Sequence, residues 1–124
     1  MAVDAMRSSY SPYSGFMVGA AVMSSDGKIY TGCNIENASY SATVCAERTA
    51  IFKAVSEGVR DFKMIAVAGG KGGVIDGAAM PCGVCRQVMA EFCRGDLPVL
   101  AVMSADGDYG EFTLKQLLPE AFGF

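Results

Sequence analysis

The chain has 124 residues, a formal net charge of -3, 52% hydrophobic residues, and no histidine or tryptophan. This length fits one domain spanning residues 1–124, with a hydrophobic core of its own. Charges of both signs are interspersed, and the longest apolar stretch, around "FMVGAAVM", is about half as long as a membrane span. We therefore expect a small-molecule partner, neither a nucleic acid polymer nor a membrane. No secretory signal pattern is visible, and we expect a cytoplasmic protein.

The first third of the chain predicts a short helix and a β-hairpin. Residues Met1 to Ser9 are typical of a helix that the proline and glycine of "SPYSG" end. The segment "FMVGAAVMSSDGKIYTGCNI" predicts two strands joined by a turn at residues 25–27, because Asp-Gly between apolar runs favours a hairpin.

The middle of the chain predicts a helix followed by a strand. The helix covers "VCAERTAIFKAVSEG", with Thr43 as its N-cap and Cys45 in its first turn. The strand covers "DFKMIAVAGG", and the glycine-rich "GGKGGVIDGAA" after it is typical of a mobile surface loop. This loop has no serine or threonine after its lysine, which argues against a phosphate cradle.

The last third predicts a second helix, two strands and a short helix. The second helix starts near Pro81, in "PCGVCRQVMAEFC". Two strands flank the Asp-Gly turn of "LPVLAVMSADGDYGEFT", and "LKQLLPE" forms the last helix. Five strands interspersed with helices predict an α/β fold, with a mixed five-stranded sheet and helices on both faces.

Cysteines stand at the start of both longer helices. The chain contains Cys33, Cys45, Cys82, Cys85 and Cys93. An odd number of cysteines in a reducing compartment favours metal binding or catalysis over a disulfide framework. Cys82 and Cys85 lie one helical turn apart, so both sulfurs can reach one ion. With no histidine in the chain, a third ligand must be a cysteine or a carboxylate, and Cys45 is best placed.

Charged residues beside these cysteines suit a catalytic metal. Helix N-termini lower the pKa of thiols, but three thiolates on a dication leave a net negative cluster that activates water poorly. Arg48, one turn after Cys45, and Arg86, next to Cys85, could offset this charge. Glu47 could face the open metal position and move protons without binding the ion.

Two other interpretations of the cysteines stay open at this point. A structural zinc site with Cys33 as fourth ligand would leave no open position and make the protein a binding module. A redox pair at Cys82 and Cys85 would fit the helix start but would leave the third cysteine unexplained. If they bind no metal, Cys33 and Cys93 are expected to be small buried side chains.

Three segments in order carry a family resemblance. "YSPYSGFMVGAA", "GCNIENASYSATVCAERTAI" and "PCGVCRQVMAEF" resemble the small homotetrameric cytidine deaminases that act on free nucleosides, over nearly the whole chain. "CAE" followed by "PCGVC" is the three-cysteine form of the zinc deaminase motif. The resemblance implies a three-layer cytidine deaminase fold and one Zn²⁺ per subunit. It also implies hydrolytic deamination of cytidine, deoxycytidine or both, in pyrimidine salvage.

The resemblance also implies roles for individual residues. Zinc would be bound by Cys45, Cys82 and Cys85, and Glu47 would be the proton shuttle. Arg48 would bond to the cysteine sulfurs, with Gln87 supporting the cluster. The implied substrate contacts within one subunit are Phe16 with the pyrimidine, Asn34 and Glu36 with the ribose, and the backbone of Ala46 with the base edge. Neighbouring subunits would contribute Tyr40 and one tail phenylalanine, Phe122 or Phe124, to each site.

Rival enzymes are distinguished by the segment "NIEN" at residues 34–37. A deaminase of another aminated heterocycle, such as blasticidin or a guanine-type base, is the nearest alternative, but "NIEN" favours a nucleoside that carries a ribose. A deaminase acting on RNA or DNA strands needs a basic or aromatic strand-binding surface, which this acidic chain does not predict.

Overall fold

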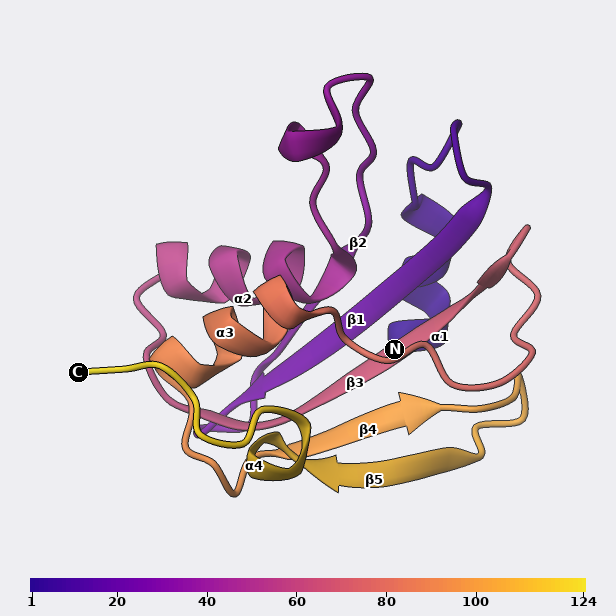
Figure 1. Ribbon diagram of the computed structural model, residues 1–124. Helices are drawn as coiled ribbons and strands as arrows, with labels where there is room; N and C mark the ends of the chain where they lie inside the picture. Colours follow the sequence, from indigo (N-terminus) through magenta and orange to yellow (C-terminus); the bar gives the residue numbers. More distant parts are fainter.

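A mixed five-stranded sheet forms the middle of the molecule in the computed structural model, which describes residues 1–124 (Figure 1). The strands are β1 (Phe16–Ser24), β2 (Ile29–Cys33), β3 (Phe62–Lys71), β4 (Pro98–Val102) and β5 (Tyr109–Thr113). The α-helices are α1 (Ala2–Ala5), α2 (Ala46–Ser56), α3 (Gly83–Phe92) and α4 (Leu114–Leu117), with 3-10 turns η1 (Met6–Ser8) and η2 (Tyr40–Ala42). The predicted order of elements is confirmed.

The strand order is β2-β1-β3-β4-β5. β1 pairs antiparallel with β2 and with β3, β3 pairs parallel with β4, and β4 pairs antiparallel with β5. The expected hairpin between β1 and β2 is present, with Gly27 at φ +92° in its turn. β2 and β3 both run opposite to β1, so the start of β1 and the ends of β2 and β3 lie at one end of the sheet.

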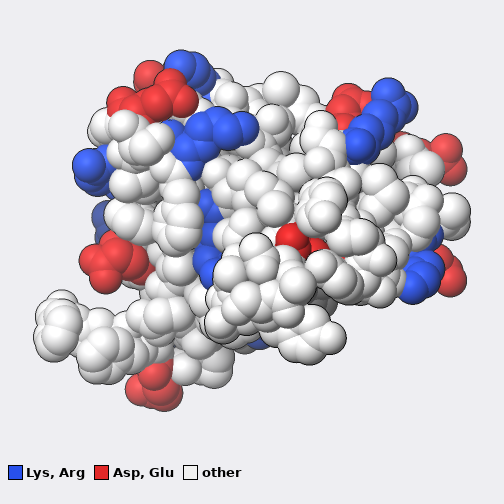
Figure 2. All heavy atoms as spheres, turned by 90° about the horizontal axis from the view of Figure 1, so that it is seen from above, with Lys and Arg blue, Asp and Glu red and all other residues white.

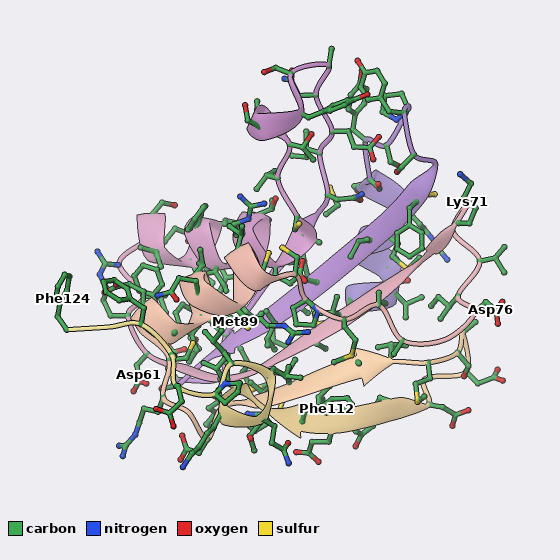
Figure 3. All side chains as sticks on the ribbon, in the orientation of Figure 1. Asp61, Lys71, Asp76, Met89, Phe112 and Phe124 are labelled. Carbon is green, nitrogen blue, oxygen red and sulfur yellow. The ribbon has the colours of Figure 1, made fainter.

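One face of the sheet is covered by α2 and α3, as Figure 1 shows. Ile51 of α2 and Met89 of α3 pack in one core cluster with Ile65, Val67 and Val99 of the sheet, and all five are at most 1% exposed. Figure 3 shows Met89 between α3 and the strands. Burial of this apolar surface fixes the two helices against the sheet, so that both helices start near the same end of it.

The other face carries α1 and η1 against β1 and β3. Ala2 and Met6 pack there with Ala68 and Val102 in a second, smaller cluster. Gly19 of β1 permits this close approach, because a Cβ at this position would lie 2.1 Å from the carbonyl oxygen of Ala2. Helices on both faces are therefore confirmed, although this face has the smaller helical cover. None of the helices combines the length and the apolar character needed to cross a membrane.

Candidate active site and metal centre

The first turns of α2 and α3 bring three cysteines together. Cys45 and Cys82 are the N-cap residues of these helices, with extended backbone, and neither side chain makes a capping hydrogen bond. Cys85 follows one turn into α3 and is fully buried. The three sulfurs lie within 4.8 Å of one another. The prediction of Thr43 as N-cap was wrong, because the Thr43 hydroxyl accepts from the Asn37 amide and closes the preceding loop.

This sulfur group fits a zinc ion. The distance between the sulfurs of Cys45 and Cys82 is 3.7 Å. Tetrahedral zinc with bonds of about 2.3 Å to sulfur places two ligand sulfurs about 3.8 Å apart. Thiolates are ligands that zinc prefers, and three of them leave a fourth position for water or substrate. Cys33 lies outside the group and donates its thiol to the Ser8 carbonyl, so a four-cysteine site is not favoured.

Hydrogen bonds within the cysteine group favour the thiolate form of Cys45. The Cys85 thiol, with help from Arg48 and Cys82, lowers the pKa of Cys45 to about 5. The interaction with Cys45, together with burial, raises the pKa of Cys85. Arg48 Nη2 lies 3.6 Å from the Cys45 sulfur and donates to it. A guanidinium at this distance offsets part of the charge of the thiolates, as expected from the sequence.

Glu47 sits beside this group with a carboxylate oxygen that has no partner. The residue is 3% exposed, and its Oε2 makes no hydrogen bond. Burial raises the pKa of Glu47 to about 7, with a smaller contribution from the charge of Cys45. A buried polar atom left unpaired costs free energy, so Oε2 is expected to form a hydrogen bond when a ligand or water occupies the site. We call Cys45, Glu47, Arg48, Cys82 and Cys85 the metal end of the site.

A cavity of about 480 Å³ extends from the metal end to the loops at the start of β1 and the end of β2. Its lining includes Phe16, Val18, Asn34, Glu36, Val44, Cys45, Glu47, Val67, Ala79 and Cys82. An adjoining cavity of about 420 Å³ shares Ser14, Glu36 and Thr43 with it and is also lined by Tyr40. The volume suits a small molecule of the size of a nucleoside.

Polar side chains at the far end of the cavity are already hydrogen-bonded to the protein. Asn34 accepts from the Val18 amide at 2.9 Å and from the Ser9 hydroxyl, and donates to the Phe16 carbonyl at 2.8 Å. Glu36 accepts from backbone amides and the hydroxyl of the Tyr13–Ser14 segment. We call Ser14, Asn34 and Glu36 the loop end of the site. Its residues tie β1, β2 and the preceding loop together as well as lining the cavity.

The remaining predicted residues fall in different places. Ala46 is fully buried at the first position of α2, and Phe16 lines the cavity with 41% exposure. Tyr40 is 81% exposed on η2. Phe122 and Phe124 lie in the exposed tail with their rings 5.5 Å apart.

Two residues of α3 contact other partners than expected. Arg86 donates to the carbonyls of Pro81 and Leu117, both at 2.7 Å, and makes no hydrogen bond to a sulfur. Gln87 donates to the Phe122 carbonyl at 3.1 Å, so it supports the tail, where the sequence analysis expected support of the cysteines. Both side chains therefore join α3 to the C-terminal segment.

Sequence reasoning missed several parts of the lining, including the apolar side chains of Val18, Val44 and Val67. Ser14 contributes its hydroxyl to the loop end. Ala78 and Ala79, from the segment predicted as a surface loop, line the cavity together with Met80, which follows them. The signal for these last three residues was their position, directly before the metal-binding "PCGVC". Neither Cys33 nor Cys93 is fully buried, although burial raises the pKa of Cys93 to about 12.

Comparison with known proteins agrees with this geometry. The model of the cytidine and deoxycytidylate deaminase zinc-binding region matches residues 1–101. The cytidine deaminase of Sporosarcina psychrophila is 55% identical over 118 residues, which cover 95% of this chain and 83% of that protein. The cytidine deaminase of Halalkalibacterium halodurans is 50% identical over 121 residues, covering 98% and 88%.

Solved structures agree as well. The crystal structure of cytidine deaminase from Burkholderia pseudomallei superposes with a TM-score of 0.88 at 46% identity, covering 98% of this chain and 93% of that one. The structure of cytidine deaminase from Mycobacterium tuberculosis gives a TM-score of 0.82 at 39% identity, covering 99% and 92%. With its three-cysteine zinc site, this chain belongs to the cytidine and deoxycytidylate deaminase family.

Proposed function

We propose that this protein catalyses the zinc-dependent hydrolytic deamination of cytidine, deoxycytidine or both, giving uridine or deoxyuridine and ammonia. The observation that carries the proposal is the partnerless Oε2 of buried Glu47 beside three thiols within 4.8 Å of one another, at the floor of a nucleoside-sized cavity. A structural zinc module has no use for a buried, unpaired carboxylate oxygen, whereas a hydrolytic enzyme needs one.

In the proposed mechanism, Glu47 moves the protons. Zinc held by Cys45, Cys82 and Cys85 supplies Lewis-acid activation of a water molecule. Glu47 takes a proton from the attacking water at Oε2 and gives it to the ring nitrogen beside the amine-bearing carbon. Oε2 then takes the second proton from the hydroxyl that the water has become on that carbon and relays it to the amine, so that the carbon–nitrogen bond breaks, ammonia leaves and the carbonyl of the product forms. A pKa of about 7 suits this task, because both protonation states are accessible near neutral pH.

Other residues would orient the base. Phe16 forms an apolar wall of the cavity and would pack against the pyrimidine ring. Ala46 is the first residue of α2, so its backbone amide is one of the donors that a helix start leaves free, and it would read the base edge. Arg48 would offset part of the negative charge of the thiolates through its hydrogen bond to Cys45.

The charge of the lining favours a nucleoside over a nucleotide. Glu36 and Glu47 are the charged carboxyl groups of the two adjoining cavities, and neither lining contains lysine or arginine. Lys71 lies close enough to lower the pKa of Glu36, but its Nζ already donates to the Ser14 carbonyl and it lines neither cavity. A phosphate dianion placed there would therefore meet chiefly like charge. Asn34 and Glu36 would instead take hydrogen bonds with sugar hydroxyls, which orient the reacting carbon through binding energy made far from it.

We further propose a homotetramer with shared active sites, in the cytoplasm, with residues 1–124 as one domain. Tyr40 is 81% exposed and Phe122 is 70% exposed, so both leave ring surface that another chain could cover. Figure 3 shows Phe124 projecting away from the body of the molecule. A neighbouring subunit would cover these rings, and its own site would receive Tyr40 and one of the tail phenylalanines. In Figure 2 positive and negative side chains are interspersed around a largely uncharged surface, which supports a small-molecule substrate over a polynucleotide.

The test is ultraviolet-monitored turnover by the purified, zinc-loaded protein, with cytidine, deoxycytidine and cytidine 5′-monophosphate as substrates. We expect conversion of at least one nucleoside and much weaker conversion of the nucleotide. Size-exclusion chromatography with light scattering measures the assembly, for which we expect four copies. A zinc-loaded, folded protein that deaminates another heterocycle but neither nucleoside would overturn the proposal.

A further inference from the structure

The hydroxyl of Ser14 connects two parts of the cavity that belong to different segments of the chain. It donates to Glu36 Oε2 and accepts from the Phe16 amide at 2.9 Å. Glu36 and Phe16 both line the cavity, Glu36 at its junction with the adjoining one. One small side chain therefore fixes a carboxylate and the backbone beside an aromatic wall at the same time.

The hydrogen bonds of Glu36 leave one acceptor position free. Oε1 accepts from the Tyr13 amide at 2.9 Å and from the Ser14 amide at 3.1 Å, and Oε2 accepts from the Ser14 hydroxyl. An ionised carboxylate has about four acceptor positions, so one remains on Oε2. The same contacts hold the pKa of Glu36 below its ordinary value, chiefly through the Ser14 hydroxyl, which keeps the group an acceptor only.

The segment that carries Ser14 is held from its other side as well. Lys71, at the end of β3, donates from Nζ to the Ser14 carbonyl, and the Gly72 amide donates to the Gly15 carbonyl at 2.8 Å. Figure 3 shows Lys71 at this end of the strand. Gly15 has φ +67°, and a Cβ there would lie 3.2 Å from Lys71 Nζ. Contacts on both sides leave the Ser14 hydroxyl a defined place between Glu36 and Phe16.

We propose that Ser14 is a positioning residue for sugar recognition, whose hydroxyl aims the one free acceptor position of Glu36 at a ribose hydroxyl and holds Phe16 beside the base. The inference rests on the proposed function, in which Glu36 takes the sugar and Phe16 the pyrimidine. A single free acceptor matches a single sugar hydroxyl. Ser14 acts through Glu36 and through the backbone of Phe16, without touching the reacting atoms.

The test compares two substrates that differ only in the sugar hydroxyls. Kinetic constants are measured for cytidine and 2′,3′-dideoxycytidine with the wild type, Ser14→Ala and Ser14→Thr. We expect Ser14→Ala to lower kcat/KM for cytidine about tenfold, mainly through KM. Without the Ser14 hydroxyl, Glu36 is misaligned and its hydrogen bond to the sugar hydroxyl is lost. For dideoxycytidine the loss should be about twofold, reflecting Phe16 alone. Ser14→Thr keeps a hydroxyl and should restore the preference for cytidine.

Controls separate this role from folding and from the proposed function. Ser25→Ala removes an exposed serine of the β1–β2 turn and should leave both substrates unchanged. If Ser14→Ala melts early, Ser14→Thr against Ser14→Val gives the same comparison at constant shape. A wild type that treats both substrates alike would refute the sugar role of Glu36. A wild type that prefers cytidine, with Ser14→Ala lowering both substrates equally or neither, would refute the role of Ser14 alone.

Discussion

The metal end and the loop end of the cavity are built on opposite principles. At the metal end, Cys45, Glu47 and Cys85 stand on the first turns of two packed helices, and Glu47 and Cys85 are buried. At the loop end, Ser14 and Glu36 stand on connecting segments, where side-chain hydrogen bonds hold the backbone. The reactive groups thus take their geometry from the core. The residues of the loop end, by contrast, must hold their own loops in place and are also the ones predicted to bind the sugar.

The largest effect is expected at the metal end from the loss of one sulfur. Cys85→Ser replaces a thiolate by a hydroxyl that stays protonated, so we expect zinc content and turnover both to fall to background. Dialysis of the wild type against a chelator should do the same, reversibly on zinc addition. Zinc stoichiometry and cytidine turnover measure both. Cys33→Ser is the matched control, and its losing zinc to the same extent would return a four-cysteine site to consideration.

The next largest effect tests whether the metal end depends on the strand beneath it. A Cβ at Gly32 of β2 would lie 2.5 Å from the Ala50 amide nitrogen and 2.7 Å from the Ala46 carbonyl oxygen of α2. Gly32→Ala should therefore displace the start of α2 and cost about 3 kcal/mol of unfolding free energy, or about 10 °C in Tm. Zinc affinity should fall with it. At Gly95 a Cβ meets only Lys115 Cβ at 3.4 Å, so Gly95→Ala should change neither quantity.

A smaller loss of stability is expected at the loop end. Asn34→Ala removes the acceptor of the Val18 amide and the donor to the Phe16 carbonyl, leaving two backbone groups unpaired. We expect a cost of about 2 kcal/mol, or about 7 °C in Tm, with zinc retained. Thermal unfolding of the zinc-loaded protein measures this. Asn34→Asp keeps the acceptor for Val18 and should lose less. A Tm unchanged in both variants would mean that Asn34 has no part in holding the loops.

The smallest effect concerns charge at the metal end. Arg48→Gln keeps a hydrogen-bond donor near Cys45 but removes the positive charge, and we expect kcat to fall about tenfold with zinc still bound. Arg48→Lys keeps the charge and should fall less. Steady-state kinetics with zinc quantified in each sample tests this. Wild-type kcat in the glutamine variant would show that the thiolates need no nearby cation.

Much of the fold could be predicted because it follows local rules. Asp-Gly turns predicted the first two strands and the last two, and the apolar run "DFKMIAVAGG" predicted the strand between them. The spacing of Cys82 and Cys85 required both sulfurs on one side of a helix start, and the absence of histidine pointed to Cys45. The start of α2 was misplaced at Thr43, since a threonine and a cysteine two residues apart can both precede a helix, and only the loop contact with Asn37 decides between them.

The partners of individual side chains could not be predicted, because they come from distant segments. Arg86 stands next to Cys85 in sequence, yet its guanidinium reaches the carbonyl of Leu117, which α4 brings to it. Asn34 and Glu36 were expected to face a ribose, but their bonds to Val18 and Ser14 depend on how β1 lies against the end of β2. Sequence spacing indicates which residues share a helix turn. It does not indicate which loop crosses above them.

The central claim is that Glu47 moves protons beside a zinc ion held by three cysteines. The most direct test is the turnover of cytidine by Glu47→Gln, with zinc content measured in the same preparation. Glutamine fills the same space but cannot take up and release a proton near neutral pH, so we predict full zinc occupancy and a kcat lower by about a thousandfold. A Glu47→Gln protein with full zinc and near-normal kcat would contradict the claim, and the proton shuttle would have to be another group.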